Sequence, residues 1–176
     1  VYVTANPYAT RIDDGTFHAV ENLLDSEWDP KAGTVHPEAV VRRALGAHEK
    51  YPNKRLIVHF MQPHFPFLGE TGTEIPGGFG RDMENNDPEE PHPWFDKLWG
   101  DGPDRDLLIR AYYENHEYIV PYARELHEEL NGKSVITSDH ANLVGERGFP
   151  IPIRLYGHPG GLYHPNLTTV PWVKLE

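Results

Sequence analysis

A long segment with helical periodicity runs directly into a short β-branched segment in the second half of the chain. Apolar residues recur every three or four positions over residues 106–130. Ser134–Ser138 then reads as a buried strand, and Arg55–Phe60, which follows a helical pattern beginning at Pro37, reads as another. Buried strands that alternate with helices predict an α/β fold with a largely parallel sheet flanked by helices.

Both ends of the chain also read as strands, and Val1–Ala5 reads as the middle of one. We therefore expect a single domain over residues 1–176 that is incomplete at its N-terminus. The apolar spacing over residues 16–24 predicts another helix, and Pro121 is expected to kink the long helix. Four segments are expected to share one sheet, with the long helix on one face: Val1–Ala5, Leu56–Phe60, Val135–Ser138 and Val170–Val173.

Residues 61–103 form a long Pro-rich segment with little predicted regular structure. A connection of this length inside a compact domain is either disordered or a functional loop. It contains an acidic stretch, Asp82–Glu90, but its aromatic residues indicate that much of it packs: Phe65, Phe67, Phe79, Trp94, Phe95 and Trp99.

The charge and composition of the chain exclude several classes of protein. Acidic residues outnumber basic ones 27 to 16, so a nucleic-acid partner is disfavoured, and the excess is compatible with a halophilic source. With no cysteine there is no thiolate metal site and no cysteine nucleophile. Because no apolar run approaches membrane-spanning length and no signal peptide is visible, we expect no membrane partner and a cytoplasmic location.

Polar residues follow two of the predicted strands, at the edge of the sheet where ligands bind in α/β proteins. One strand leads into His64, and the other ends in Asp139-His140. A carboxylate next to an imidazole can bind one divalent ion. A Gly-rich segment with His158 and His164 follows.

Each of these residues also has a simpler interpretation. These are a capping turn for Asp139-His140, a core histidine at position 59, a surface turn at His64, and ordinary loop residues for His158 and His164.

The order of several motifs carries a resemblance to a known family. His59-Phe-x-x-Pro-His64-x-Pro-Phe comes first, and Ala111-Tyr-x-x-Asn115 lies in the long helix. Gly132-Lys-x-Val-Ile-Thr-Ser-Asp-His140, Gly145-Glu-Arg and Val170-Pro-Trp follow. This succession resembles the C-terminal two-thirds of sulfatases of the alkaline phosphatase superfamily, particularly archaeal members, over nearly the whole chain. The resemblance implies an alkaline-phosphatase-like fold.

The resemblance also implies roles for individual residues. Asp139 and His140 match the pair that ligates the metal, which could be Ca²⁺, Mn²⁺, Zn²⁺ or Mg²⁺. His64 matches the histidine that contacts sulfate or phosphate oxygens or protonates the leaving group. His158 matches the residue that completes the anion pocket, and we expect it to serve as a metal ligand and, with His64, as a catalytic residue. His164 is the alternative for the role of His158.

The chain departs from the family pattern in two ways. Ala141 replaces the usual glycine after Asp-His. The Cys/Ser-x-Pro-x-Arg nucleophile motif does not occur in the sequence. In the family, that motif and the first metal-binding aspartates precede the segment that matches Val1–Val3, so Asp13 and Asp14 do not match ligands. We therefore expect a missing N-terminal segment of the same polypeptide, without which these residues are inactive.

Three functional hypotheses follow from these patterns. The first is a metal-dependent hydrolase of small sulfate or phosphate esters, and the second is a non-catalytic metal- or anion-binding remnant of the same fold. The third, a protein-interaction domain that uses the Pro-rich segment, leaves Asp139-His140 unexplained. The hydrolase hypothesis requires the strands before His64 and Asp139 to share one sheet. It also requires Asp139, His140 and His158 to lie within about 10 Å of each other.

Overall fold

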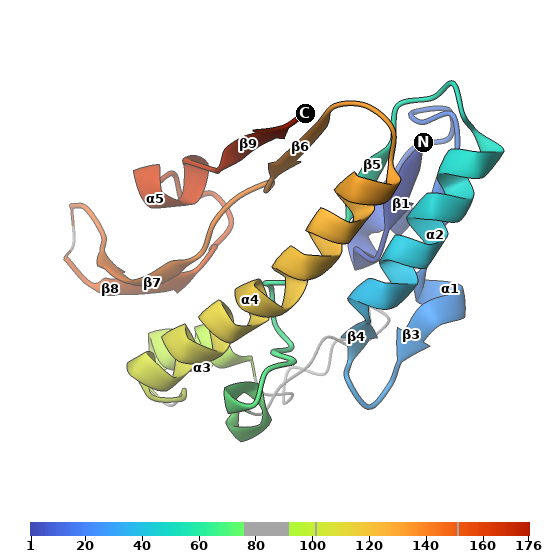
Figure 1. The fold of residues 1–176 in the computed structure, drawn as a ribbon. Coiled ribbons are helices and arrows are strands. Elements are labelled where there is room, and N and C mark those ends of the chain that lie inside the picture. Colours follow the sequence, from blue (N-terminus) through green and yellow to red (C-terminus); the bar gives the residue numbers. More distant parts are fainter. Residues whose placement is uncertain (76–91, 101, 151) are drawn as a thin grey trace.

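The computed structural model has a mixed α/β fold built around a three-stranded parallel sheet in the order β2-β1-β5 (Figure 1). It describes residues 1–75, 92–100, 102–150 and 152–176. The predicted α/β class is confirmed, as are the strands expected near residues 1–5 and 55–60. The sheet strands are β1 (Tyr2–Thr4), β2 (Val20–Asn22) and β5 (Ile57–His59).

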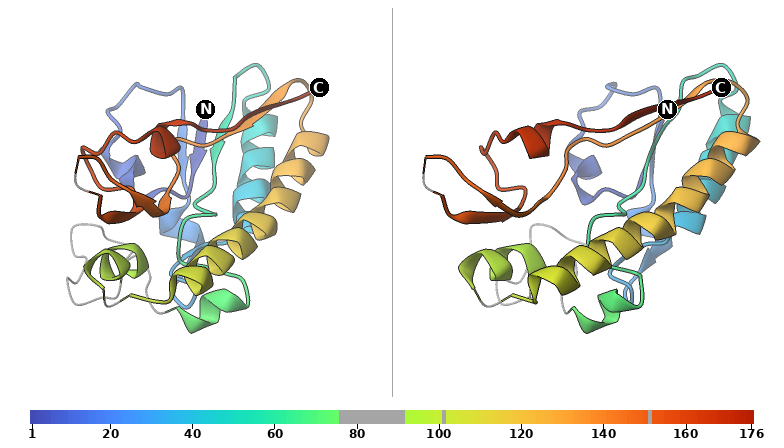
Figure 2. Two further views of the ribbon diagram at one scale, coloured as in Figure 1. Left: turned by 90° about the vertical axis from the view of Figure 1, so that its left-hand side faces the viewer. Right: turned by 60° about the vertical axis from the view of Figure 1, so that its left-hand side comes forward.

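Two long helices, α2 (Pro37–Lys50) and α4 (Arg105–Glu129), lie side by side on one face of this sheet (Figures 1 and 2). Both were predicted from sequence. Pro37 occupies the first turn of α2, and α4 continues through Pro121. The main core lies between the sheet and the helices, and it includes Val3, Leu23, Val35, Val40, Ala44 and Leu126.

The predicted single sheet is wrong. Strand β6 (Ser134–Thr137) pairs antiparallel with β9 (Trp172–Leu175) in a separate two-stranded ribbon. In the described residues no backbone ladder joins this ribbon to the parallel sheet. Strand β9 runs antiparallel to β6 and pairs with the backbone N–H and C=O groups along one edge of β6. The ribbon therefore forms without β5. The strands themselves were predicted correctly, but their pairing was not.

The helix predicted over residues 16–24 is also wrong. Val20–Asn22 instead forms strand β2, which pairs with β1, and only the short helix α1 (Leu24–Glu27) follows. Leu23 and Leu24 are both buried in the main core. A strand joined to a short helix therefore buries the same apolar residues that suggested a helical face.

A second and a third small core lie apart from the main core. Phe65, Phe67 and Trp94 of the Pro-rich segment are buried in the second core, as expected from their aromatic character. Phe79 and Asp82–Glu90 lie outside the described residues. The other elements are η1 (Pro7–Arg11), β3 (Trp28–Asp29), β4 (Thr34–Val35), η2 (Thr71–Glu74), α3 (Pro93–Trp99), β7 (Leu143–Arg147), β8 (Arg154–Gly157) and α5 (Pro165–Thr168). Among the described helices, none is long and apolar enough to cross a membrane.

Candidate metal and anion site

Residues from three distant segments meet beyond the ends of β5, β6 and β8. The rings of His140 and His158 have their centres 4.2 Å apart, and those of His64 and His158 are 5.5 Å apart. Asp139 Oδ2 lies 3.7 Å from His140 Nε2. The predicted proximity of Asp139, His140 and His158 is therefore confirmed. The loops that bring these residues together leave separate sheets and do not extend from one shared sheet edge.

The three imidazoles are oriented in the same way. In each ring, Nδ1 lies within hydrogen-bonding distance of an oxygen: Phe65 O at 2.7 Å for His64, Ala141 O at 3.0 Å for His140, and Asn142 Oδ1 at 2.7 Å for His158. A carbonyl oxygen can only accept, so Nδ1 carries the proton. In a neutral ring the electron pair is then on Nε2, which is the arrangement found in metal-binding histidines.

Two of these imidazoles are neutral at neutral pH. Burial lowers the pKa of His64 to about 4. Burial, with the nearby His140 as a further cause, lowers the pKa of His158 to about 4, although Asp139 opposes the shift. Neutral rings with Nδ1–H offer Nε2 as a ligand atom or hydrogen-bond acceptor rather than as a proton donor.

The donor types fit a divalent ion, but their present arrangement is not a finished metal site. Two imidazoles on one tetrahedral ion, with metal–nitrogen bonds near 2.0–2.1 Å, have their ring centres about 5.3 Å apart. The 5.5 Å separation of His64 and His158 agrees with this value, whereas the 4.2 Å separation of His140 and His158 is too short. Across the described ranges, no three His, Asp or Glu side chains form a ready metal-binding group. Metal binding therefore requires these side chains to move by about an ångström.

The loop that carries His64 is held by Asn115 of α4, whose side chain is 0% exposed. Asn115 Oδ1 accepts a hydrogen bond from the Leu68 backbone N–H at 2.9 Å. Its Nδ2 donates to the backbone carbonyls of Pro63, His64 and Pro66 at 3.2, 2.9 and 3.3 Å. The buried amide of Asn115 therefore fixes the backbone of the His64 loop.

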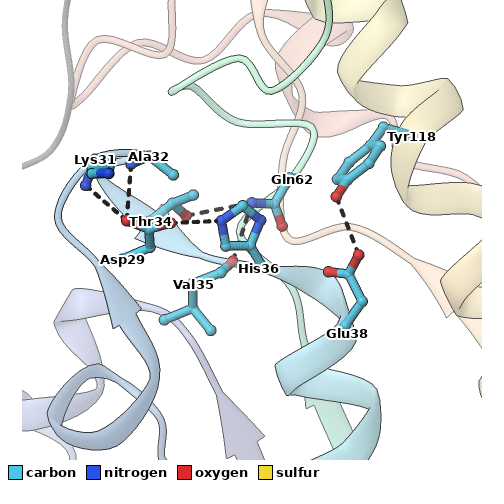
Figure 3. Close-up of polar contacts among 9 residues, drawn as sticks. All are labelled: Asp29, Lys31, Ala32, Thr34, Val35, His36, Glu38, Gln62 and Tyr118. Atoms are coloured by element: carbon cyan, nitrogen blue, oxygen red, sulfur yellow. Dashed lines mark hydrogen bonds and ion pairs between the residues drawn. The ribbon is translucent and has the colours of Figure 1, made fainter.

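The same loop is attached at its start to the β3–β4 hairpin (Figure 3). Buried Gln62 donates through Nε2 to Thr34 Oγ1 and Val35 O, both at 3.4 Å. The hairpin is itself closed by a 3.0 Å contact between Asp29 Oδ2 and His36 Nε2. Gln62 and Asn115 thus hold the backbone on both sides of the His64 imidazole.

His59 and Tyr2 connect the parallel sheet to this cluster. The Tyr2 hydroxyl and His59 Nδ1 are hydrogen-bonded at 2.6 Å, as expected for a hydrogen-bonded core histidine. Burial lowers the pKa of His59 and raises that of Tyr2, and the charge of Asp139 acts on both groups. Asp139 therefore lies close to the end of β5, although β5 and β6 are not paired.

Sequence reasoning missed two residues of the site. His92 is half-buried with its ring centre 4.6 Å from that of Phe65, and burial lowers its pKa. Asn142 gave no signal beyond its position shortly after Asp139. The alternative His164 is used locally instead, since its Nδ1 accepts from the Asn166 N–H at 3.1 Å and caps α5.

Lowering the pH from 7 to 5 is expected to cost about 2 kcal/mol of unfolding free energy through His64. Its pKa falls from 6.5 to about 4 in the folded chain, so between these values the unfolded chain binds a proton that the folded chain excludes. This contribution is fully present above the unfolded pKa and is lost as the pH falls toward 4. Urea unfolding of wild type and His64→Gln at both pH values measures it. Equal losses in the two proteins would contradict the prediction.

Comparisons with protein-family models, with curated proteins and with solved structures found no match. Among the described residues, the site offers the carboxylate of Asp139 and imidazoles whose Nδ1 protons are already bonded. Such a set can hold a divalent cation, and the bound cation can attract an oxyanion.

Proposed function

We propose that this chain is the metal- and anion-binding part of a sulfatase-like hydrolase of sulfate or phosphate esters, with an alkaline-phosphatase-like fold. The observation that carries the proposal is the meeting of His64, Asp139, His140 and His158, which are far apart in sequence. One stated requirement of this hypothesis is not met, because β5 and β6 belong to separate sheets in the described residues. The proposal therefore rests on the side-chain cluster and on the order of motifs in the sequence.

The cluster suggests how the work would be divided among these residues. Asp139, through its carboxylate, and His140 and His158, through Nε2, would hold the ion. When bound, the metal supplies Lewis-acid stabilisation of the charge that develops on the sulfuryl or phosphoryl oxygens. His64 lies beside His158, where an anionic substrate would favour the protonated imidazole. In that form His64 can donate to the departing oxygen.

A non-catalytic metal- or anion-binding module is the second candidate, and one observation favours it. The Cys/Ser-x-Pro-x-Arg motif is absent from the sequence. Hydrolysis of 4-nitrophenyl sulfate and 4-nitrophenyl phosphate by these residues alone is therefore expected to remain at the buffer background. Binding, rather than turnover, is the property that tests the site in this chain.

Calorimetric titration with Mn²⁺ and Zn²⁺ is the direct test. We expect weak binding, because two or three protein ligands leave the ion largely hydrated, and lower affinity at acid pH, because protonated imidazoles cannot ligate. Phosphate or sulfate should then bind measurably only when the metal is present. His158→Ala should weaken metal binding, whereas the exposed His116→Ala should not. A chain that binds neither metal nor anion would rule the proposal out.

A further inference from the structure

Asn142 lies opposite His158 because of the register of the β7–β8 hairpin. Leu143 and Gly157 are partners at the end of this ladder, so the residue before β7 faces the residue after β8. Leu143 is fully buried, and a Cβ at Gly157 would lie only 3.0 Å from Trp94 Cβ, so both sides of the hairpin end are closely packed. The 2.7 Å contact between Asn142 Oδ1 and His158 Nδ1 is therefore set by well-anchored backbone.

The Asn142 side chain also lies near Tyr112 of α4. Burial raises the pKa of the Tyr112 phenol, and the Asn142 side chain opposes this shift. An amide has its donors on one end and its acceptor on the other. Because Oδ1 is the end that lies 2.7 Å from His158 Nδ1, the His158 ring must carry its proton on Nδ1.

We propose that Asn142 is a positioning residue, which holds His158 in the Nδ1–H form and so makes Nε2 the atom that binds the ion; this inference rests on the metal site proposed above. His64 and His140 have the same form, because their Nδ1 atoms face backbone carbonyls. Asn142 gives the His158 ring the same tautomer as His64 and His140. The opposite amide orientation would place a proton on His158 Nε2 and make that atom a hydrogen-bond donor instead of a ligand.

The protonation of His158 can be read directly by NMR. Protonated and unprotonated ring nitrogens differ strongly in ¹⁵N chemical shift, and the His158 signals are assigned by their loss in His158→Ala. We expect Nδ1–H in the metal-free wild type at neutral pH, and a shift toward Nε2–H in Asn142→Ala. Asn142→Asp keeps an oxygen acceptor and should restore Nδ1–H. A wild-type ring protonated on Nε2, or one unaffected by Asn142→Ala, would overturn the inference.

Zn²⁺ affinity gives a second readout that is measured on the same proteins. Losing the partner that orients a ligating histidine typically costs 10–100-fold in metal affinity, so Asn142→Ala should weaken Zn²⁺ binding by about that factor. Asn142→Asp should recover it. The matched control is Asn166→Ala, which removes an exposed bond to Glu146 and should leave Zn²⁺ affinity unchanged.

The two proposals fail in different ways. If the wild type binds no Zn²⁺ but His158 has Nδ1–H that depends on Asn142, the positioning of the ring stands and the metal site is wrong. If the wild type binds Zn²⁺ and Asn142→Ala binds it equally well, the metal site stands and the role of Asn142 is wrong. Loss in both Asn142→Ala and Asn142→Asp, with unchanged ring protonation, would also overturn the role of Asn142.

Discussion

Replacing Asn115 with alanine is expected to lower the free energy of unfolding by about 4 kcal/mol, with a fall in Tm of about 10 °C. Asn115 is fully buried, and its amide makes four hydrogen bonds to the backbone of the His64 loop. Alanine leaves the Leu68 N–H and three carbonyls without this partner, and each buried group left unsatisfied costs about 1–3 kcal/mol. Partial relaxation of the loop keeps the total below the full sum.

Urea denaturation, together with hydrogen exchange at the Leu68 amide, measures the effect of Asn115→Ala. Asn115→Asp is an informative second variant, since it keeps the acceptor for Leu68 but turns a carboxylate toward three carbonyl oxygens. We expect it to be destabilised to a similar degree. The exposed Asn53→Ala serves as the control and should change stability by less than about 0.5 kcal/mol. A loss below about 1 kcal/mol in Asn115→Ala, with unchanged exchange at Leu68, would contradict the prediction.

Asp139→Ala is expected to abolish detectable Mn²⁺ and Zn²⁺ binding while leaving the fold intact. Asp139 is the carboxylate of the cluster, with Oδ2 3.7 Å from His140 Nε2, and its side chain is largely exposed. Removing it deletes a charged ligand from a site that already has few, so an initially weak affinity falls below the range of calorimetry. Because the side chain is exposed, thermal unfolding in the absence of metal should change little.

Asp14→Ala is the matched control for this second prediction. Asp14 is exposed and, like its neighbour Asp13, was not expected to be a ligand. Its removal should leave metal affinity unchanged. Tight binding that persists in Asp139→Ala would move the metal elsewhere, most plausibly to the turn that contains His59 and His64, and Asp139 would then have to be dropped as a ligand.

Sequence alone determined where most of the regular structure lies. The long helix 105–129, the helix that begins at Pro37 and the strands near residues 2–4, 57–59, 134–137 and 172–175 were all predicted from periodicity, because the burial of one face leaves a pattern that neighbouring residues share. The same signal was ambiguous over residues 16–24. There a strand and a short helix together bury Leu23 and Leu24 as well as a single helix would.

Strand pairing was decided only by the tertiary structure. A buried apolar run records that a strand is covered, but it does not record which strand lies beside it. Ser134–Thr137 therefore could not be assigned to β9 rather than to β5 before the fold was known. The candidate ligands were identifiable from residue type and order, since Asp139, His140 and His158 stand in recognisable motifs.

The sequence likewise could not predict which ring nitrogen of each imidazole carries the proton. Which ring nitrogen of His158 carries the proton depends on Asn142, which the β7–β8 register places opposite it. The position of His64 depends on Asn115, a residue of a distant helix. Local patterns record burial and chain direction, whereas hydrogen bonds between distant segments form only when the packed elements bring donor and acceptor together. For that reason the sequence determined which residues are candidates, and the tertiary structure decided what each of them can do.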